Sequence, residues 1–153
     1  MVVEIQTMQG DVELNLSASE AWEMFRNDEV MSKVSPKVVV GVGYIEGNGE
    51  PGSLRHLKFG HDVEDFVHES TQRIDKVETG KSVTYTVIEG SLTKLYDPYS
   101  VTFTFDPVVG EETSKCTVQW KAEFASRSPE VPPPERARDV ALGFIRCFDK
   151  LPL

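Results

Sequence analysis

The sequence predicts an α+β domain in which an antiparallel sheet packs against one long C-terminal helix. Between Val38 and Phe124, runs rich in Val, Ile, Thr, Tyr and Phe alternate with turn residues and show a period of two. After Pro132–Pro134, apolar residues recur instead at steps of three and four. Because an antiparallel sheet with one solvated face must cover its other face, we expect this helix to pack on the sheet.

Residues 1–37 predict one strand and two short helices. Residues 2–16 alternate loosely, as a first strand does. Ser17 then supplies a capping oxygen for a helix that ends near Asn27. A second helix begins at about Glu29 and must stop before Pro36, because the proline ring disfavours the α conformation at the preceding residue.

The middle of the chain predicts strand after strand, about seven in all when the first is included. Alternation is clearest in residues 83–87, 101–105 and 118–124. Turn signals separate the strands at Gly47–Gly52, Gly60–Asp62, Glu78–Gly80, Glu89–Ser91, Asp97–Pro98 and Gly110–Glu111.

The C-terminal helix has one apolar and one charged face. The apolar face, expected against the sheet, carries Ala137, Val140, Ala141, Phe144 and Phe148. The face expected in water carries Glu135, Arg136, Arg138, Asp139 and Arg146. A sheet and a single long helix are compatible with several α+β topologies.

Length and charge limit the classes of partner. The 153 residues contain no linker or repeat, so we expect a single domain over residues 1–153. With 25 acidic and 16 basic residues the formal net charge is −9. Nucleic acid and anionic membranes are therefore poor partners, since both attract concentrated Lys and Arg. We expect a monomer, with a dimer as the alternative.

Residues Met1–Gln6 contain no basic segment followed by an apolar one, and no apolar run is long enough to span a membrane. The chain is therefore expected to be cytoplasmic. Its two cysteines, Cys116 and Cys147, lack a metal-binding spacing, so reduced core cysteines are expected, and oxidation to a disulfide stays open.

The sequence predicts neither a metal nor a cofactor. His56, His61 and His68 lie at spacings that no common structural zinc motif uses. The Gly-rich loop Glu46–Ser53 lacks both a helix directly behind it and a closing Lys-Ser/Thr pair, which phosphate-binding loops need. By itself the loop indicates a structural hairpin.

The same loop resembles the Glu-Gly-Asn-Gly-Gly-Pro-Gly-Ser/Thr run of the birch-pollen allergen superfamily of plant proteins, which it matches at all but one position. Other segments are similar to the major latex protein and pathogenesis-related class ten branches, and the similarity covers nearly all of the chain. These segments are Trp22–Phe25, Met31–Pro36, Lys81–Tyr85, Val87–Gly90 and Gln119–Trp120. The resemblance implies a helix-grip fold, with a curved sheet around the long helix and a large internal cavity.

The resemblance and the strand parity together predict which residues contact a ligand in that cavity. For any one of them, ordinary core packing is the alternative. They are Arg55, Leu57, Phe59, Phe66, His68, Val83, Tyr85, Val87, Tyr99, Val101, Phe103, Trp120, Val140, Phe144 and Phe148.

Glu64, His68, Tyr85 and Tyr99 are the candidates for acid/base chemistry, because they share the inward parity and burial can move a pKa towards neutrality. Solvated positions for Glu64 and His68 at the cavity mouth are the alternative.

Two functions follow from the resemblance. The first is an intracellular, defence-related carrier of small amphipathic plant metabolites or hormones, such as flavonoids, cytokinins or sterol-like compounds. The alternative is an enzyme of plant specialised metabolism, a cofactor-independent cyclase, condensing enzyme or isomerase. Family enzymes that condense dopamine with an aldehyde carry a Lys where this chain has Thr71 or Gln72, and an Asp where it has Lys94. The Ser-Gly-Leu-Pro-Ala gate of abscisic acid receptors is also missing, so hormone sensing by that gate is not expected. A nuclease function is not expected either, because the net negative charge of the chain repels nucleic acid.

Overall fold

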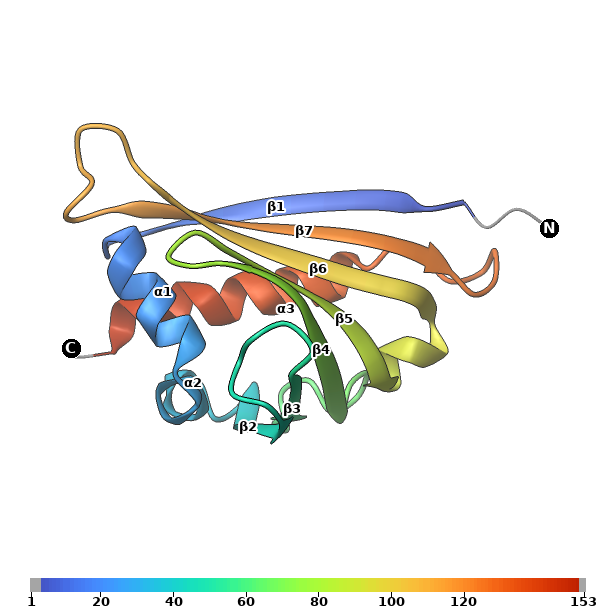
Figure 1. The fold of residues 1–153 in the computed structure, drawn as a ribbon. Coiled ribbons are helices and arrows are strands. Elements are labelled where there is room, and N and C mark those ends of the chain that lie inside the picture. Colours follow the sequence, from blue (N-terminus) through green and yellow to red (C-terminus); the bar gives the residue numbers. More distant parts are fainter. Residues whose placement is uncertain (1–3, 152–153) are drawn as a thin grey trace.

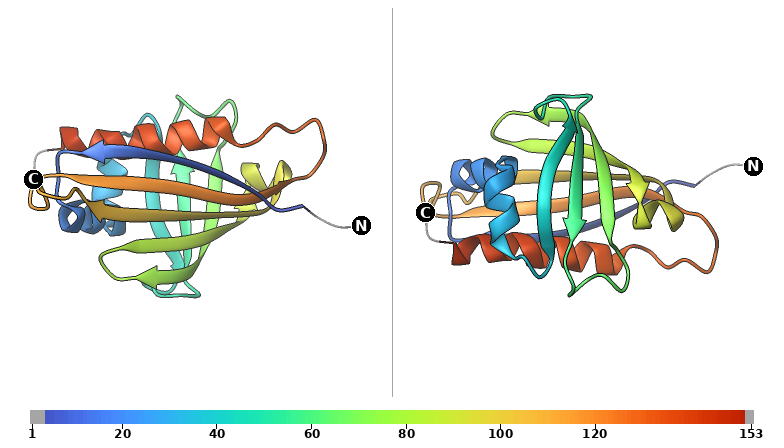
Figure 2. Two further views of the ribbon diagram at one scale, coloured as in Figure 1. Left: turned by 90° about the horizontal axis from the view of Figure 1, so that it is seen from above. Right: turned by 90° about the horizontal axis from the view of Figure 1, so that it is seen from below.

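The computed structural model describes residues 4–151 and confirms the predicted α+β architecture, with a curved sheet wrapped around one long helix (Figure 1). The single antiparallel sheet has seven strands in the spatial order β1-β7-β6-β5-β4-β3-β2. Their bounds are β1 Gln6–Leu14, β2 Val39–Glu46, β3 Leu54–Phe59, β4 Glu69–Glu78, β5 Ser82–Gly90, β6 Tyr96–Pro107 and β7 Cys116–Ser126. The sheet twists so strongly that β2 and β3 run crosswise to β6 and β7 (Figure 2).

Two short helices, α1 Ala18–Arg26 and α2 Asp28–Val34, follow the first strand as predicted. A capping box begins α1, because the Glu20 amide donates to Ser17 Oγ and the Ser17 amide donates to the Glu20 carboxylate, both at 3.1 Å. Asn27 ends α1 and caps α2, since its side-chain oxygen accepts from the first turn of α2 at 3.1 Å. One residue thus fixes the angle between the two helices.

The long helix α3, Glu135–Arg146, follows Pro134 and continues into a 3₁₀ turn, η2, at Cys147–Lys150. Its apolar face meets the sheet as predicted, and Phe144 is buried. Phe148 is also buried, although it lies in η2 rather than in α3. None of the helices within residues 4–151 is long and apolar enough to cross a membrane.

One predicted turn is wrong. Asp97–Pro98 does not separate two strands but lies inside β6, and the chain turns earlier, in the 3₁₀ helix η1 at Ser91–Lys94. The pairing of β6 with β7 is irregular between Tyr96 and Tyr99. A proline is compatible with a strand at such an irregularity, where no ladder hydrogen bond needs its missing N–H group.

The core is densely aromatic at the end of the sheet that α1 covers. The Phe105 ring lies 5.7 Å from the Trp22 ring and 5.5 Å from the Phe25 ring, centroid to centroid. Phe103 continues this cluster along β6, 4.9 Å from Phe25. Such aromatic pairs add to the stability that burial itself gives.

We predict that Gly90→Ala destabilises the fold far more than Gly80→Ala. Both glycines have positive φ angles, 119° and 77°, so alanine strains either backbone by about 1 kcal/mol or more. Only at Gly90 would a Cβ also collide with backbone, the carbonyl of Glu69, whereas Gly80 has open space around it. Urea unfolding of both variants measures the difference, and equal losses would contradict the steric argument.

Candidate functional site

A cavity of about 100 Å³ lies between the concave face of the sheet and α3, beside the aromatic cluster. This volume is smaller than the large cavity implied by the family resemblance and below the roughly 300–1,000 Å³ typical of sites for drug-sized ligands. The sheet forms one wall, and α3 forms the other with small and apolar side chains, among them Ala137, Val140, Ala141 and Phe144.

Most of the predicted ligand-contacting residues line this cavity. Those in the wall are Arg55, Leu57, Phe59, Phe66, Tyr85, Val87, Tyr99, Phe103, Trp120, Val140 and Phe144. The structure places three others, Val83, Val101 and Phe148, in the buried core but outside the wall. These three residues therefore lie where ordinary core packing, the alternative to ligand contact, would put them.

Glu64 and His68 do not face the cavity. Both side chains are exposed, because residues 61–66 form consecutive turns rather than a strand, so a step of two no longer keeps residues on one face. The turns are held by their own hydrogen bonds, such as that from the Phe66 amide to the Val63 carbonyl at 3.0 Å. Of residues 60–68, Phe66 and Val67 line the cavity.

Two polar residues of the wall, Ser70 and Gln72, are not among those predicted from the sequence. Both lie on β4, whose mostly polar sequence hides the alternation of its faces. Strand pairing could have revealed them, because Ser70 pairs with Leu57 and Gln72 with Arg55, two residues predicted to face inward. The other wall residues that were not predicted as ligand contacts are Phe25, Met31, Val38, Val39, Val67, Leu92, Ala137, Ala141 and Ile145.

Ser70 and Gln72 give the sheet wall a polar strip. Ser70 is 2% exposed and Gln72 is 8% exposed. Within residues 4–151 the Ser70 hydroxyl has no hydrogen-bond partner. A buried hydroxyl without a partner is unfavourable, so this oxygen is available to a ligand that reaches the strip.

Two tyrosines complete the polar side of the cavity. Burial raises the pKa of Tyr85, although the nearby Arg55 opposes the shift. Burial also raises the pKa of Tyr99, and Tyr85 and Tyr96 add to the effect. Both phenols therefore stay protonated at neutral pH. Among the wall residues that the structure describes there is no carboxylate and no imidazole, so the cavity lacks an acid/base pair.

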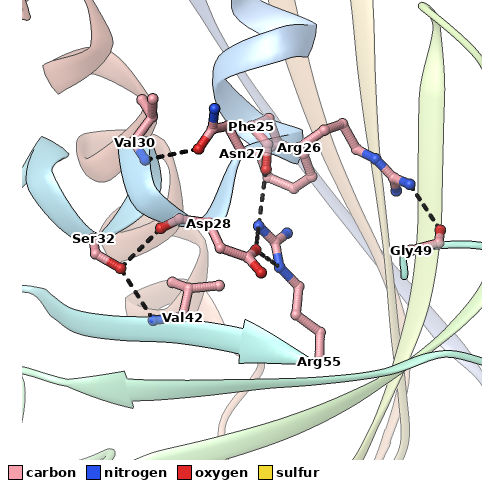
Figure 3. Close-up of polar contacts among 9 residues, drawn as sticks. All are labelled: Phe25, Arg26, Asn27, Asp28, Val30, Ser32, Val42, Gly49 and Arg55. Carbon is pink, nitrogen blue, oxygen red and sulfur yellow. Dashed lines mark hydrogen bonds and ion pairs between the residues drawn. The ribbon is translucent and has the colours of Figure 1, made fainter. Parts of the chain in front are cut away.

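Arg55 is the charged residue of the wall, and it is already paired. Figure 3 shows its side chain reaching from β3 to the junction of α1 and α2. Its guanidinium donates to Asp28 Oδ1 from Nε at 3.1 Å and from Nη2 at 2.9 Å, and Nη2 also donates to the Phe25 carbonyl at 3.0 Å. The side chain of Arg55 is 5% exposed and that of Asp28 is 27% exposed. The pair is therefore largely removed from water.

A surface ion pair holds the segment 60–68 against α3. Arg136 Nη1 and Nη2 donate to the two carboxylate oxygens of Asp65, at 2.7 and 2.6 Å. The same guanidinium lies 4.2 Å from the centre of the Phe66 ring, which lines the cavity. Hydrogen bonding to Arg136 lowers the pKa of Asp65 below its ordinary value of 3.8, so the pair stays charged at neutral pH.

The Gly-rich loop Glu46–Ser53 satisfies its own backbone groups. The Asn48 amide donates to the Glu50 carboxylate at 3.0 Å, and the Gly49 amide donates to Ser53 Oγ at 3.1 Å. The Gly49 carbonyl accepts from Arg26 Nη2 at 2.7 Å (Figure 3). Hydrogen bonds from backbone amides lower the pKa of Glu50. A phosphate would have to displace this carboxylate, so the loop is structural.

The two cysteines are free thiols. Cys116 is buried, and burial together with surrounding carboxylates raises the pKa of its thiol to about 11. A thiol with so high a pKa is protonated and unreactive at neutral pH. No group of three or more His, Cys, Asp or Glu side chains within residues 4–151 is arranged to hold a metal ion.

Comparison with known protein sequences identifies relatives that agree with one another on the family. The family model described as "Pathogenesis-related protein Bet v 1 family" matches residues 3–150. MLP-like protein 31 of Arabidopsis thaliana is 32% identical over 94% of this chain and 83% of its own length. MLP-like protein 28 of the same plant is 34% identical over 84% of this chain, which spans 38% of that longer relative.

Solved structures agree on the fold. The major latex-like protein 151 of Panax ginseng superposes with a TM-score of 0.83 at 18% sequence identity, over 97% of this chain and 99% of that one. A truncated norcoclaurine synthase of Thalictrum flavum superposes with a TM-score of 0.74 at 17% identity, over 100% of this chain and 98% of that one. At such identities the likeness establishes the helix-grip fold alone.

We predict that Phe105→Ala costs about 3–5 kcal/mol of unfolding free energy, while Phe144→Ala costs roughly half that or less. Phe105 is 1% exposed and packs among aromatic rings, whereas Phe144 borders the cavity and has fewer contacts to lose. Chemical denaturation of both variants tests this. A Phe144→Ala loss as large as that of Phe105→Ala would show that Phe144 is packed core.

We predict that Ser70→Ala leaves the unfolding free energy unchanged or raises it, because the change removes a buried hydroxyl that has no partner. Ser53→Ala is the matched control, since both serines are 2% exposed. Ser53 Oγ accepts the Gly49 amide, so its loss should cost about 1–3 kcal/mol. Urea unfolding compares the two, and a clear loss in Ser70→Ala would mean that its hydroxyl is satisfied in solution.

Proposed function

Since the chain belongs to the pathogenesis-related protein Bet v 1 family, we propose that it binds a small amphipathic plant metabolite or hormone in the cavity and acts as its carrier. The observation that supports this most is the cavity itself, which lies between the sheet and α3 and is lined mainly by apolar side chains with a few polar ones. That combination is typical of small-molecule sites, where apolar area contributes affinity and polar groups fix orientation.

The size of the cavity favours compact ligands. At about 100 Å³, the space accommodates part of a ring system before the wall has to move. Phe66 and Phe144 are bulky wall residues, so a larger ligand would have to displace their rings. A flavonoid or an adenine-type cytokinin therefore requires a smaller rearrangement than a bulky sterol does. We propose that the carrier acts in the cytoplasm and, as the family resemblance implies, in plant defence.

Catalysis by the predicted residues receives less support. Glu64 and His68 are exposed and lie outside the cavity wall, while Tyr85 and Tyr99 stay protonated. Norcoclaurine synthase of Thalictrum flavum has been solved in complex with dopamine and hydroxybenzaldehyde. By analogy with that fold, small aromatic compounds are suitable ligands, but the acid/base groups that a condensing enzyme needs are missing from this wall.

We predict saturable, micromolar binding of the uncharged fluorescent probe N-phenyl-1-naphthylamine, with displacement by a flavonoid or a cytokinin. Ala141→Phe should weaken binding at least ~tenfold, because Ala141 lines the cavity and a phenyl ring would fill it. Arg146→Phe introduces the same ring on the exposed face of α3 and should leave the affinity unchanged.

Fluorescence titration of the three proteins gives the dissociation constants. Equal affinity in the wild type and in Ala141→Phe would place the bound probe elsewhere on the protein. Absence of saturable binding in the wild type would remove the carrier function.

A further inference from the structure

We propose that the cavity accepts uncharged ligands and rejects carboxylates, and that Asp28 sets this preference by neutralising Arg55. The inference rests on the proposed function, since it concerns the ligand of the same cavity.

Arg55 supplies the charge of the cavity wall, and this charge already has partners. A buried arginine usually attracts an anion, but the Nε and Nη2 groups of Arg55 already donate to Asp28 and to the Phe25 carbonyl. The guanidinium also lies 5.6 Å from the centre of the Phe25 ring and 5.7 Å from that of Tyr44. Arg55 is therefore held at the junction of β3, α1 and α2, with its charge balanced.

A carboxylate ligand would meet a guanidinium that already has a carboxylate partner. It would share one guanidinium with Asp28, so that two carboxylates face one cation and one negative charge remains uncompensated. Burial of an uncompensated charge is strongly unfavourable, and two carboxylates in one site repel each other. The other polar groups of the wall, Ser70, Gln72, Tyr85 and Tyr99, are neutral and cannot compensate that charge.

The wall offers hydrogen-bonding partners to an uncharged polar group of a ligand. Hydroxyl and amide side chains both donate and accept hydrogen bonds, and the Ser70 hydroxyl has no partner of its own within residues 4–151. A ligand hydroxyl, carbonyl or amide can satisfy that oxygen without bringing charge. The α3 wall, with Ala137, Val140 and Phe144, offers only apolar contacts. The ligand class is thus an uncharged ring compound with one polar edge.

The test uses two probes of nearly the same shape, 2-naphthamide and 2-naphthoate, titrated into the wild-type protein by calorimetry at neutral pH. We expect 2-naphthamide to bind at least ~tenfold more tightly, since only the carboxylate brings a net charge into the wall. This comparison needs no variant, so it does not depend on the folding of one.

The variant Asp28→Asn tests the role of Asp28. Asparagine keeps the oxygen that accepts from Arg55 and removes the negative charge, which leaves the guanidinium uncompensated. The preference should then invert, with 2-naphthoate gaining at least ~tenfold in affinity over the wild type. Asp139→Asn is the matched control, because Asp139 also contacts an arginine, Arg138 at 3.1 Å, but is exposed on α3. It should preserve the wild-type preference.

The outcomes separate the two proposals. If 2-naphthamide and N-phenyl-1-naphthylamine both fail to bind, the carrier function fails and this inference fails with it. If 2-naphthamide and 2-naphthoate bind the wild type with equal affinity, the carrier function stands and the proposed charge preference is wrong. If the preference exists but Asp139→Asn shifts it as much as Asp28→Asn does, the overall charge of the protein determines it rather than the pair with Arg55.

Discussion

The contact on which this structure depends most is the clamp formed by Arg55, Asp28 and the Phe25 carbonyl. It joins β3 to the junction of α1 and α2, and so fixes the short helices against the far edge of the sheet. A buried guanidinium tolerates little displacement, because losing its partners leaves an uncompensated charge in a poorly hydrated site. The neighbouring hydrogen bond from the Val42 amide to Ser32 Oγ, at 3.3 Å, secures α2 on the edge strand β2.

The cavity is a consequence of curvature combined with small residues. A strongly bent sheet presents more concave surface than one helix can cover. On α3, Ala137 and Ala141 occupy positions where larger side chains would reach the sheet, and space remains in front of them. At the other end, Trp22 and Phe105 are buried in the same interlayer space, and their rings pack edge to face. The fold thus has a packed end that provides stability and a looser part that can hold a ligand.

The sequence predicts a strand and its inward face only where apolar and polar residues alternate along that strand. In residues 101–105 and 118–124, apolar and polar residues alternate because one face of the strand is dry, so strand and inward face were both predictable. In β4 the inward residues Ser70 and Gln72 are themselves polar, and the pattern is lost. Around Phe66 the chain turns, so parity carries no information. The pairing of Arg55 with Asp28 joins positions 27 residues apart, which no local pattern encodes.

One wall of the cavity belongs to α3 and the other to the sheet, so the size of a ligand and its chemistry depend on different elements. In the proposed ligand site, side-chain volume on α3 limits how large a guest can be, whereas the hydroxyl and amide groups of β4, beside Arg55 on β3, select among the uncharged groups that it can carry. A substitution at Ala141 changes the first property without touching the strip at Ser70, and the reverse also holds. Proteins with this arrangement can therefore diversify in guest size and in guest chemistry by independent single substitutions, while the sheet that supports both stays the same.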